Sequence, residues 1–354
     1  MARSRKTSRR RPASKVAAVV CLVAVLLFIV ALYALFLKPN HAALPDGTAV
    51  TYTVKSGASS AGIAAGMKKA GLIDSTTIFQ FRLLKSGARR YLKAGTHRFV
   101  AGSNYDRLIL ELQQSPGAPA VKVVIPEGKN IKQIAAILED KLGLSAAEFT
   151  AYAEHAAPDF VDQYPFLAGV YGDSLEGYLF PDTYQFSKDS SIKQVCSDML
   201  GRFSQVWSTL SVPDSAPYSA TQLVTIASLV EKEVSVPAER PLVSSVIYNR
   251  LDRNMRLQLC STVQFLLPDP DKNKLRLTAD DLATPSPYNT YLHAGLPPGP
   301  IANPGKAALQ AAIAPAKTDY LYFVLTGKDG SQTFAATNEE FARAKALSKQ
   351  VFGQ

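Results

Sequence analysis

The chain has 354 residues and a formal net charge of +10, and seven of its basic residues lie within the first fifteen positions. The rest of the chain therefore carries only about +3, which gives no electrostatic case for a nucleic acid or another polyanionic partner. The four histidines lack the spacing of metal ligands, and the sequence predicts neither a metal site nor a cofactor (His41, His97, His155 and His293).

The N-terminal region predicts a membrane anchor. Residues 1–15 form a basic tail without an acidic residue, and residues 16–37 form an apolar stretch without a charge. These 22 residues would make a helix about 33 Å long, enough to span a bilayer core. No good cleavage site follows, and residues 38–47 read as a linker. The positive-inside rule keeps the tail in the cytoplasm and places the rest of the chain outside. The alternative for the tail is a nucleic-acid-binding arm.

A repeated pattern follows the linker. Strand-like residues 50–54 lead to Gly57 and, six positions later, to Ile63; residues 121–125 lead to Gly128 and, six positions later, to Ile134. Each copy predicts a strand, a glycine turn and an amphipathic helix. The pattern resembles the LysM glycan-binding module, and a generic strand–helix packing unit is the alternative.

Residues 115–119 (S-P-G-A-P) are the best domain break after the anchor. The sequence therefore predicts an α+β chain with a small LysM-like subdomain over residues 48–120 and a larger α+β domain over residues 121–354. Near its end, residues 320–325 and 332–334 predict two strands joined by a turn at residues 327–330.

A helix with a clear start contains two carboxylates two positions apart. Ser219 and Gln222 can form a capping box, and Pro237 ends the helical pattern. Residues 228–233 read S-L-V-E-K-E. The apolar stripe is made by Leu223, Ile226, Val230 and Val234, and the residues opposite it are Ser228 and Lys232.

Two positions along a helix correspond to a rotation of about 200°. Glu231 and Glu233 therefore point to nearly opposite sides, so that one can line a cleft while the other does not. Periodicity alone does not say which one enters a cleft, and two solvated carboxylates remain the alternative. Pro241 suits the first turn of the next helix.

Two further segments are dense in polar and aromatic residues, at positions 175–184 and 284–305. Aromatic faces stack on sugar rings while amides and hydroxyls bind sugar hydroxyls, so both segments suit a sugar cleft. Rigid surface loops are the alternative.

Together these segments resemble the membrane-anchored endolytic murein transglycosylases. The matching text comprises residues 175–177, 181–184, 227–233, 239–240, 246–251, 255–258, 288–291, 295–301 and 303–305. The resemblance implies that Glu233, the second glutamate of E-K-E, is the catalytic acid. It further implies a cleft in which Glu176 binds substrate or supports Glu233. The remaining expected substrate-binding residues are Gln258, Thr262, Tyr288 and Asn289.

The sequence departs from the family pattern in two places. Cys260 and Ser261 stand where many relatives have Asp-Pro, and Gln332 stands where many have His. The first departure puts any role of that Asp in doubt, and the second removes a late His as an essential base. The two cysteines outside the anchor, Cys196 and Cys260, could pair in an oxidising compartment, which sequence cannot decide.

The resemblance implies a lyase that cleaves the MurNAc-β-1,4-GlcNAc bond inside nascent peptidoglycan strands, leaving a 1,6-anhydro end and terminating strand elongation. A hydrolytic muramidase using a second carboxylate such as Glu176 or Asp182 and a non-catalytic peptidoglycan-binding scaffold are the alternatives. The implied partners are glycan strands, the membrane and the cell-wall synthesis enzymes. The implied location is the inner (plasma) membrane, as a single-pass protein with its catalytic domain outside the cytoplasm.

Overall fold

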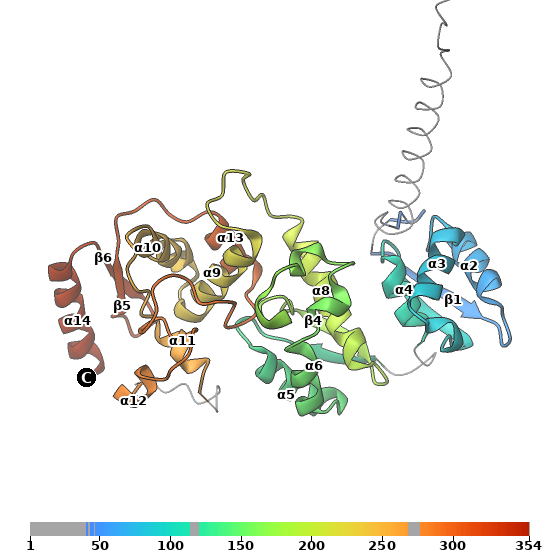
Figure 1. Ribbon diagram of the computed structural model, residues 1–354, viewed down its shortest axis with the longest axis horizontal. Helices are drawn as coiled ribbons and strands as arrows, with labels where there is room; N and C mark the ends of the chain where they lie inside the picture. The colour runs from blue at the N-terminus through green and yellow to red at the C-terminus, as the bar shows by residue number, and fades with distance from the viewer. Residues whose placement is uncertain (1–39, 42, 46, 114–119, 268–276, 354) are drawn as a thin grey trace, which may run out of the picture. The chain divides into compact units, whose positions relative to one another are not determined.

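The computed structural model describes residues 40–41, 43–45, 47–113, 120–267 and 277–353 (Figure 1). The predicted tail and membrane helix, residues 1–37, lie outside this range. Within the described part of the chain, no helix is both long and apolar enough to cross a bilayer. The chain divides into two compact units, residues 1–118 and 119–354, each with its own hydrophobic core. The mixed α+β class predicted from the sequence is confirmed.

The first unit is a two-stranded antiparallel sheet with helices packed on it. Its elements are β1 (Ala49–Val54), α2 (Ser60–Lys69), α3 (Thr76–Lys85), η1 (Ala88–Arg90), β2 (Gly95–Val100) and α4 (Tyr105–Leu112). In the sheet, Ala49 lies opposite Val100 and Val54 opposite Gly95. The helices bury Met67, Phe79 and Leu108 in a common core.

The second unit begins with the same kind of arrangement. Its first elements are β3 (Ala120–Val124), α5 (Ile131–Leu142), α6 (Ala146–Ala153), α7 (Ala157–Phe160), η2 (Pro165–Leu167), η3 (Tyr171–Asp173), β4 (Thr183–Ser187) and α8 (Ile192–Trp207). Strands β3 and β4 pair antiparallel, with Val124 opposite Thr183. In both units, the two paired strands are therefore separated along the sequence by at least two helices.

The predicted repeat of strand, glycine turn and helix is present in both copies. Gly57 follows β1 and Gly128 follows β3, and both have φ of +74°, a left-handed conformation that glycine adopts without strain. The buried face of α2 includes Ile63, and that of α5 includes Ile134. The glycine and the apolar period together set the turn and the buried face.

The rest of the second unit is largely helical. It comprises α9 (Ala220–Glu233), η4 (Pro237–Glu239), α10 (Arg240–Asp252), α11 (Cys260–Gln264), α12 (Ala279–Leu282), α13 (Lys306–Ile313), β5 (Tyr322–Leu325), β6 (Gln332–Ala335) and α14 (Asn338–Phe352). Helix α9 packs against α10, α11 and α13, and α14 packs across the β5–β6 pair (Figure 1). The predicted late hairpin is confirmed, with Tyr322 opposite Ala335.

Cys196 is buried in α8, and Cys260 is exposed at the start of α11. Both are free thiols, so the disulfide left open by the sequence is not formed.

Candidate active site

Helix α9 packs against α10, α11 and α13 within the second unit. Ser219 accepts a hydrogen bond from the Gln222 N–H, and the Gln222 side chain accepts one from the Ser219 N–H. The predicted capping box is therefore confirmed. Every residue from Leu223 to Val230 is buried, whereas the period predicted only one buried stripe. This difference arises because neighbouring helices and loops cover the helix on all sides.

Ser228 shows the consequence of this burial. It was expected opposite the apolar stripe, but it is fully buried and its Oγ accepts a hydrogen bond from the Ile301 N–H at 3.1 Å. The same Oγ donates to the carbonyl of Thr225 at 2.7 Å. The helix therefore fixes the proline-rich segment at residues 295–301 through a polar contact.

The two carboxylates of the E-K-E sequence have different surroundings. Glu231 Oε2 accepts a hydrogen bond from the Gly305 N–H at 3.1 Å, and its Oε1 lies 3.6 Å from Arg240 Nη2. The Glu231 side chain is 7% exposed and is thus held in the protein interior. Glu233 ends the helix, lines a cavity and accepts a long hydrogen bond of 3.4 Å from the Ser261 N–H.

The surroundings of Glu233 favour its protonated form. Burial raises the pKa of this carboxyl above its ordinary value of 4.5, while contacts with Ser261 and the positive charge of Lys232 lower it. A desolvated carboxylate is disfavoured relative to the neutral acid. Glu233 therefore keeps its proton to a higher pH than a solvent-exposed glutamate does.

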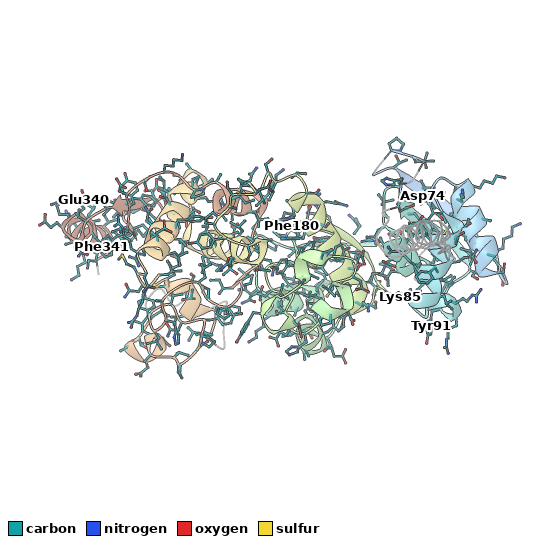
Figure 2. All side chains as sticks on the ribbon, turned by 45° about the horizontal axis from the view of Figure 1, so that its top comes forward. Asp74, Lys85, Tyr91, Phe180, Glu340 and Phe341 are labelled. Carbon is teal, nitrogen blue, oxygen red and sulfur yellow. The ribbon has the colours of Figure 1, made fainter. Side chains whose placement is uncertain are left out.

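The cavity that Glu233 lines has a volume of about 530 Å³ and mixed walls. It is lined by amide, thiol, hydroxyl and aromatic side chains, including Gln258, Cys260, Tyr291, Tyr322, Phe323, Gln332 and Phe341. Phe341 of α14, labelled in Figure 2, stacks on Tyr322 of β5 with ring centroids 4.7 Å apart. Such walls offer faces for sugar rings and donors for their hydroxyls.

Among the described residues that line this cavity, Arg250 is the one cation, and its guanidinium already donates hydrogen bonds within the protein. Its Nε donates to the Leu321 carbonyl at 2.6 Å, and its Nη1 donates to the carbonyls of Arg256 and Leu257 at 3.1 and 2.8 Å. It therefore joins α10 to the two segments that form the cavity walls.

Gln258 and Thr262 act at the cavity in different ways. Gln258 lines it in a left-handed conformation with φ of +50°, and its N–H donates to the Thr290 carbonyl at 3.1 Å. Thr262 is fully buried, and its Oγ1 lies 2.9 Å from Thr290 Oγ1 and donates to the Leu259 carbonyl. Thr262 and Thr290 thus lie behind the cavity wall and stabilise it, whereas Gln258 is part of the wall surface.

Of the five expected substrate-binding residues, Gln258 alone lines the Glu233 cavity, whereas Thr262, Asn289, Tyr288 and Glu176 do not. Asn289 is fully buried, and its Nδ2 donates to the carbonyls of Leu282 and Thr284. The Tyr288 ring packs against Phe265, with ring centroids 5.2 Å apart.

Glu176 lies at the N-terminus of α5. Its Oε2 accepts from the Ile131 N–H at 2.9 Å and its Oε1 from Asn303 Nδ2 at 2.8 Å. Burial raises its pKa to about 8, against hydrogen bonds that favour the carboxylate. Its contacts are those of a residue that joins α5 to the segment around Asn303, and its role in substrate binding stays a prediction.

Sequence reasoning missed the aromatic wall made by Tyr322, Phe323 and Phe341. The sequence indicates the first two only as part of a strand, and it contains no local signal for Phe341. Cys260 and Gln332 were noted only as departures from the family pattern. In the structure both line the cavity, and Gln332 Nε2 donates to the main-chain carbonyl of Glu233 at 2.7 Å. Among the residues that the structure describes, no three His, Cys, Asp or Glu side chains are grouped as a metal site requires.

Known proteins of one family resemble this chain over most of its length. A profile of the YceG-like family matches residues 52–347. An endolytic murein transglycosylase of Bacillus subtilis (strain 168) is 35% identical over 309 residues, which cover 84% of each chain. An endolytic murein transglycosylase of Streptococcus pneumoniae (strain D39) is 32% identical over 321 residues, covering 83% of this chain and 57% of that longer protein.

A crystal structure of a yceG-like protein from Listeria monocytogenes has a TM-score of 0.57 and 31% identity, and the match covers 84% of this chain and 99% of that one. Because the family profile spans most of the sequence and the relatives align over most of it, the chain belongs to the YceG-like family.

Proposed function

We propose that the protein is an endolytic murein transglycosylase that cuts peptidoglycan strands with Glu233 as its acid. The observation that carries this proposal is that Glu233 is the single carboxylate among the described residues lining its cavity. Glycoside hydrolases usually place two carboxyl groups about 5–5.5 or 6.5–9.5 Å apart. One carboxyl group suits a reaction in which the sugar supplies its own nucleophile. The activity carried by the names of the relatives supports the same reading.

The reaction can proceed through one group acting twice. Glu233 donates its proton to the glycosidic oxygen as the bond from the muramic acid C1 breaks. The resulting carboxylate accepts the proton of the muramyl O6 hydroxyl as O6 attacks C1. The products are a free 4-hydroxyl on N-acetylglucosamine and a 1,6-anhydro end, and no water is consumed. The raised pKa of Glu233 supports the first step because the acid must be protonated.

The predicted anchor at residues 16–37 would hold the enzyme at the outer face of the inner (plasma) membrane, where glycan strands are made. There it would terminate elongation of nascent strands beside the cell-wall synthesis enzymes. This location and these partners rest on the sequence pattern and the family resemblance.

The decisive test is product analysis of Glu233→Gln. We expect loss of at least a hundredfold of the anhydro-ended fragments, in the range typical of losing a general acid, with an unchanged circular dichroism spectrum. Glu231→Gln is the matched control, because glutamine keeps an acceptor for the Gly305 N–H, and we expect it to retain activity.

Mass spectrometry separates the alternatives. Products with a reducing-end muramic acid, heavier by one water, would identify a muramidase. Binding to sacculi without any product would identify a scaffold. Wild-type activity in Glu233→Gln would remove this residue from the mechanism.

A further inference from the structure

A second cavity lies at the opposite end of α9 from Glu233. It has a volume of about 480 Å³ and is lined by Thr221, Gln222 and Thr225 of α9. Its other walls are Tyr171, Tyr178 and the proline-rich segment at residues 295–300, with Tyr218 and Leu251. The mechanism proposed above uses none of these lining residues.

Gln222, which lines the second cavity, and Glu233, which lines the first, lie on one side of α9. Gln222 and Glu233 are eleven residues apart, which corresponds to about 16 Å along the helix and to within about 20° of three full turns. Ile226 and Leu229, which lie between them along the helix, are fully buried. The second cavity is therefore a separate hollow and not an extension of the first.

The proline-rich wall of this cavity is closely packed against its neighbours. A Cβ on Gly177, which has φ of +90°, would lie 2.5 Å from Pro300, so the two segments are in direct contact. Immediately after Pro300, the Ile301 N–H is held by Ser228 Oγ. A wall fixed in this way loses little conformational entropy when a ligand binds.

The lining of the second cavity is uncharged. None of its lining residues is Asp, Glu, Lys, Arg or His, so an ionic group would lose its hydration there without gaining a partner. Tyr171, Tyr178 and Tyr218 offer aromatic faces, and Gln222 and Thr221 add polar groups. Aromatic faces combined with a few neutral polar groups suit a sugar ring without a carboxylate.

Tyr178 supplies an independent sign of a ligand. Its side chain is 1% exposed, and its Oη has no hydrogen-bond partner among the described residues. A buried hydroxyl without a partner costs about 1–3 kcal/mol. Tyr178 also lines the second cavity, so a ligand oxygen that reached this hydroxyl would supply the missing partner.

We propose that the second cavity binds a neutral N-acetylhexosamine unit of the glycan, the N-acetylglucosamine type and not the muramyl type with its carboxylate. This inference rests on the proposed function only in taking peptidoglycan as the ligand. It assigns Tyr171 as a stacking residue and the uncharged lining as the cause of selectivity. A site of this kind, whose Gln222 is separated from Glu233 by about 16 Å along α9, would hold the strand away from its ends and favour cleavage inside it.

The test uses hydrogen exchange of the full chain with chitotetraose, a β-1,4 tetramer of N-acetylglucosamine. We expect chitotetraose to slow exchange of the four amide hydrogens in residues 295–301, those of Gly295, Leu296, Gly299 and Ile301, since proline carries none. Tyr171 is 52% exposed, so Tyr171→Ala should leave the fold intact. We expect this variant to need at least ten times more chitotetraose for half-maximal protection. Tyr171→Phe keeps the ring and should retain the protection, and Leu347→Ala, an exposed site on α14, should behave as wild type.

The absence of protection at residues 295–301 at saturating chitotetraose would overturn the proposal, as would equal protection in wild type and Tyr171→Ala. Cellotetraose lacks the acetamide, and protection by it as strong as by chitotetraose would overturn the assignment to an N-acetylhexosamine. None of these outcomes requires catalysis. A failure of the proposed catalytic function would instead be detected by product analysis of Glu233→Gln. Binding of chitotetraose to the first unit would protect peptides from that unit and would not change exchange in residues 295–301.

Discussion

Glu231 and Glu233 show how two carboxylates on one helix turn acquire different chemistry. Glu231 is held by the Gly305 N–H and lies near Arg240, so its charge is compensated in the interior. Glu233 lines a cavity and accepts a long hydrogen bond from Ser261, and burial outweighs this contact and the charge of Lys232, so its pKa rises. The helix rotation separates the two side chains, and their neighbours then decide which one is an acid.

The pH dependence of activity should report the protonation of Glu233. The acid must carry its proton, so activity should fall as pH rises through the pKa of Glu233, which lies above 4.5. Lys232 lowers this pKa, so Lys232→Met should move the descending limb to higher pH. The measurement is kcat against pH with Lys188→Met, an exposed site, as the control. A limb that stays in place or moves to lower pH would contradict the assignment.

Glu176 is expected to act through the fold. Glu176→Ala leaves the Ile131 N–H and Asn303 Nδ2 without their partner, and each buried unpaired donor costs about 1–3 kcal/mol. We therefore expect a lower urea midpoint, with near wild-type turnover well below the unfolding temperature. Unchanged stability with lost turnover would instead make Glu176 a substrate-binding residue.

At the scale of elements, α9 organises the second unit from its two ends and its middle. The capping box fixes its start and Glu233 marks its end. Between them, Ser228 holds the proline-rich segment that walls the second cavity. One helix therefore sets the positions of both cavities.

Ser228→Ala should loosen the proline-rich segment. The substitution leaves the Ile301 N–H unpaired in a buried position, which should lower the free energy of unfolding by about 1–3 kcal/mol. Urea unfolding measures this change, and exposed Ser235→Ala is the control. A shift no larger than that of the control would show that the hydrogen bond does not stabilise the segment.

At the scale of the whole molecule, the two units have separate cores. One hydrophobic cluster draws on residues 54–112 and the other on residues 123–312. Both units pair two strands around helices, after turns made by Gly57 and Gly128. The strand, glycine turn and helix are therefore similar in local structure in both copies, but each copy packs in a separate hydrophobic core.

A fragment of residues 119–354 should fold alone because its core contains no residue of the first unit. We expect a single cooperative thermal transition followed by circular dichroism, and retained cleavage of soluble glycan strands. If the fragment is unfolded, the second unit depends on contacts with the first.

Much of the local structure could be predicted from the sequence because its causes act within a few residues. The glycine turns, the capping box at Ser219 and the late hairpin follow from backbone freedom, side-chain caps and apolar period. The rotation between Glu231 and Glu233 is likewise a property of any helix.

The tertiary structure alone decided what each carboxylate and each loop does. The Glu233 cavity joins Gln258, Tyr322 and Phe341, which lie far apart in the sequence, and no local pattern records that they meet. Burial of Glu176 and Asn289 and the separation of two cavities along α9 likewise depend on packing between distant segments. A sequence determines which elements form from short-range interactions, whereas the surroundings that set a pKa or shape a cavity come from side chains brought together only by the fold.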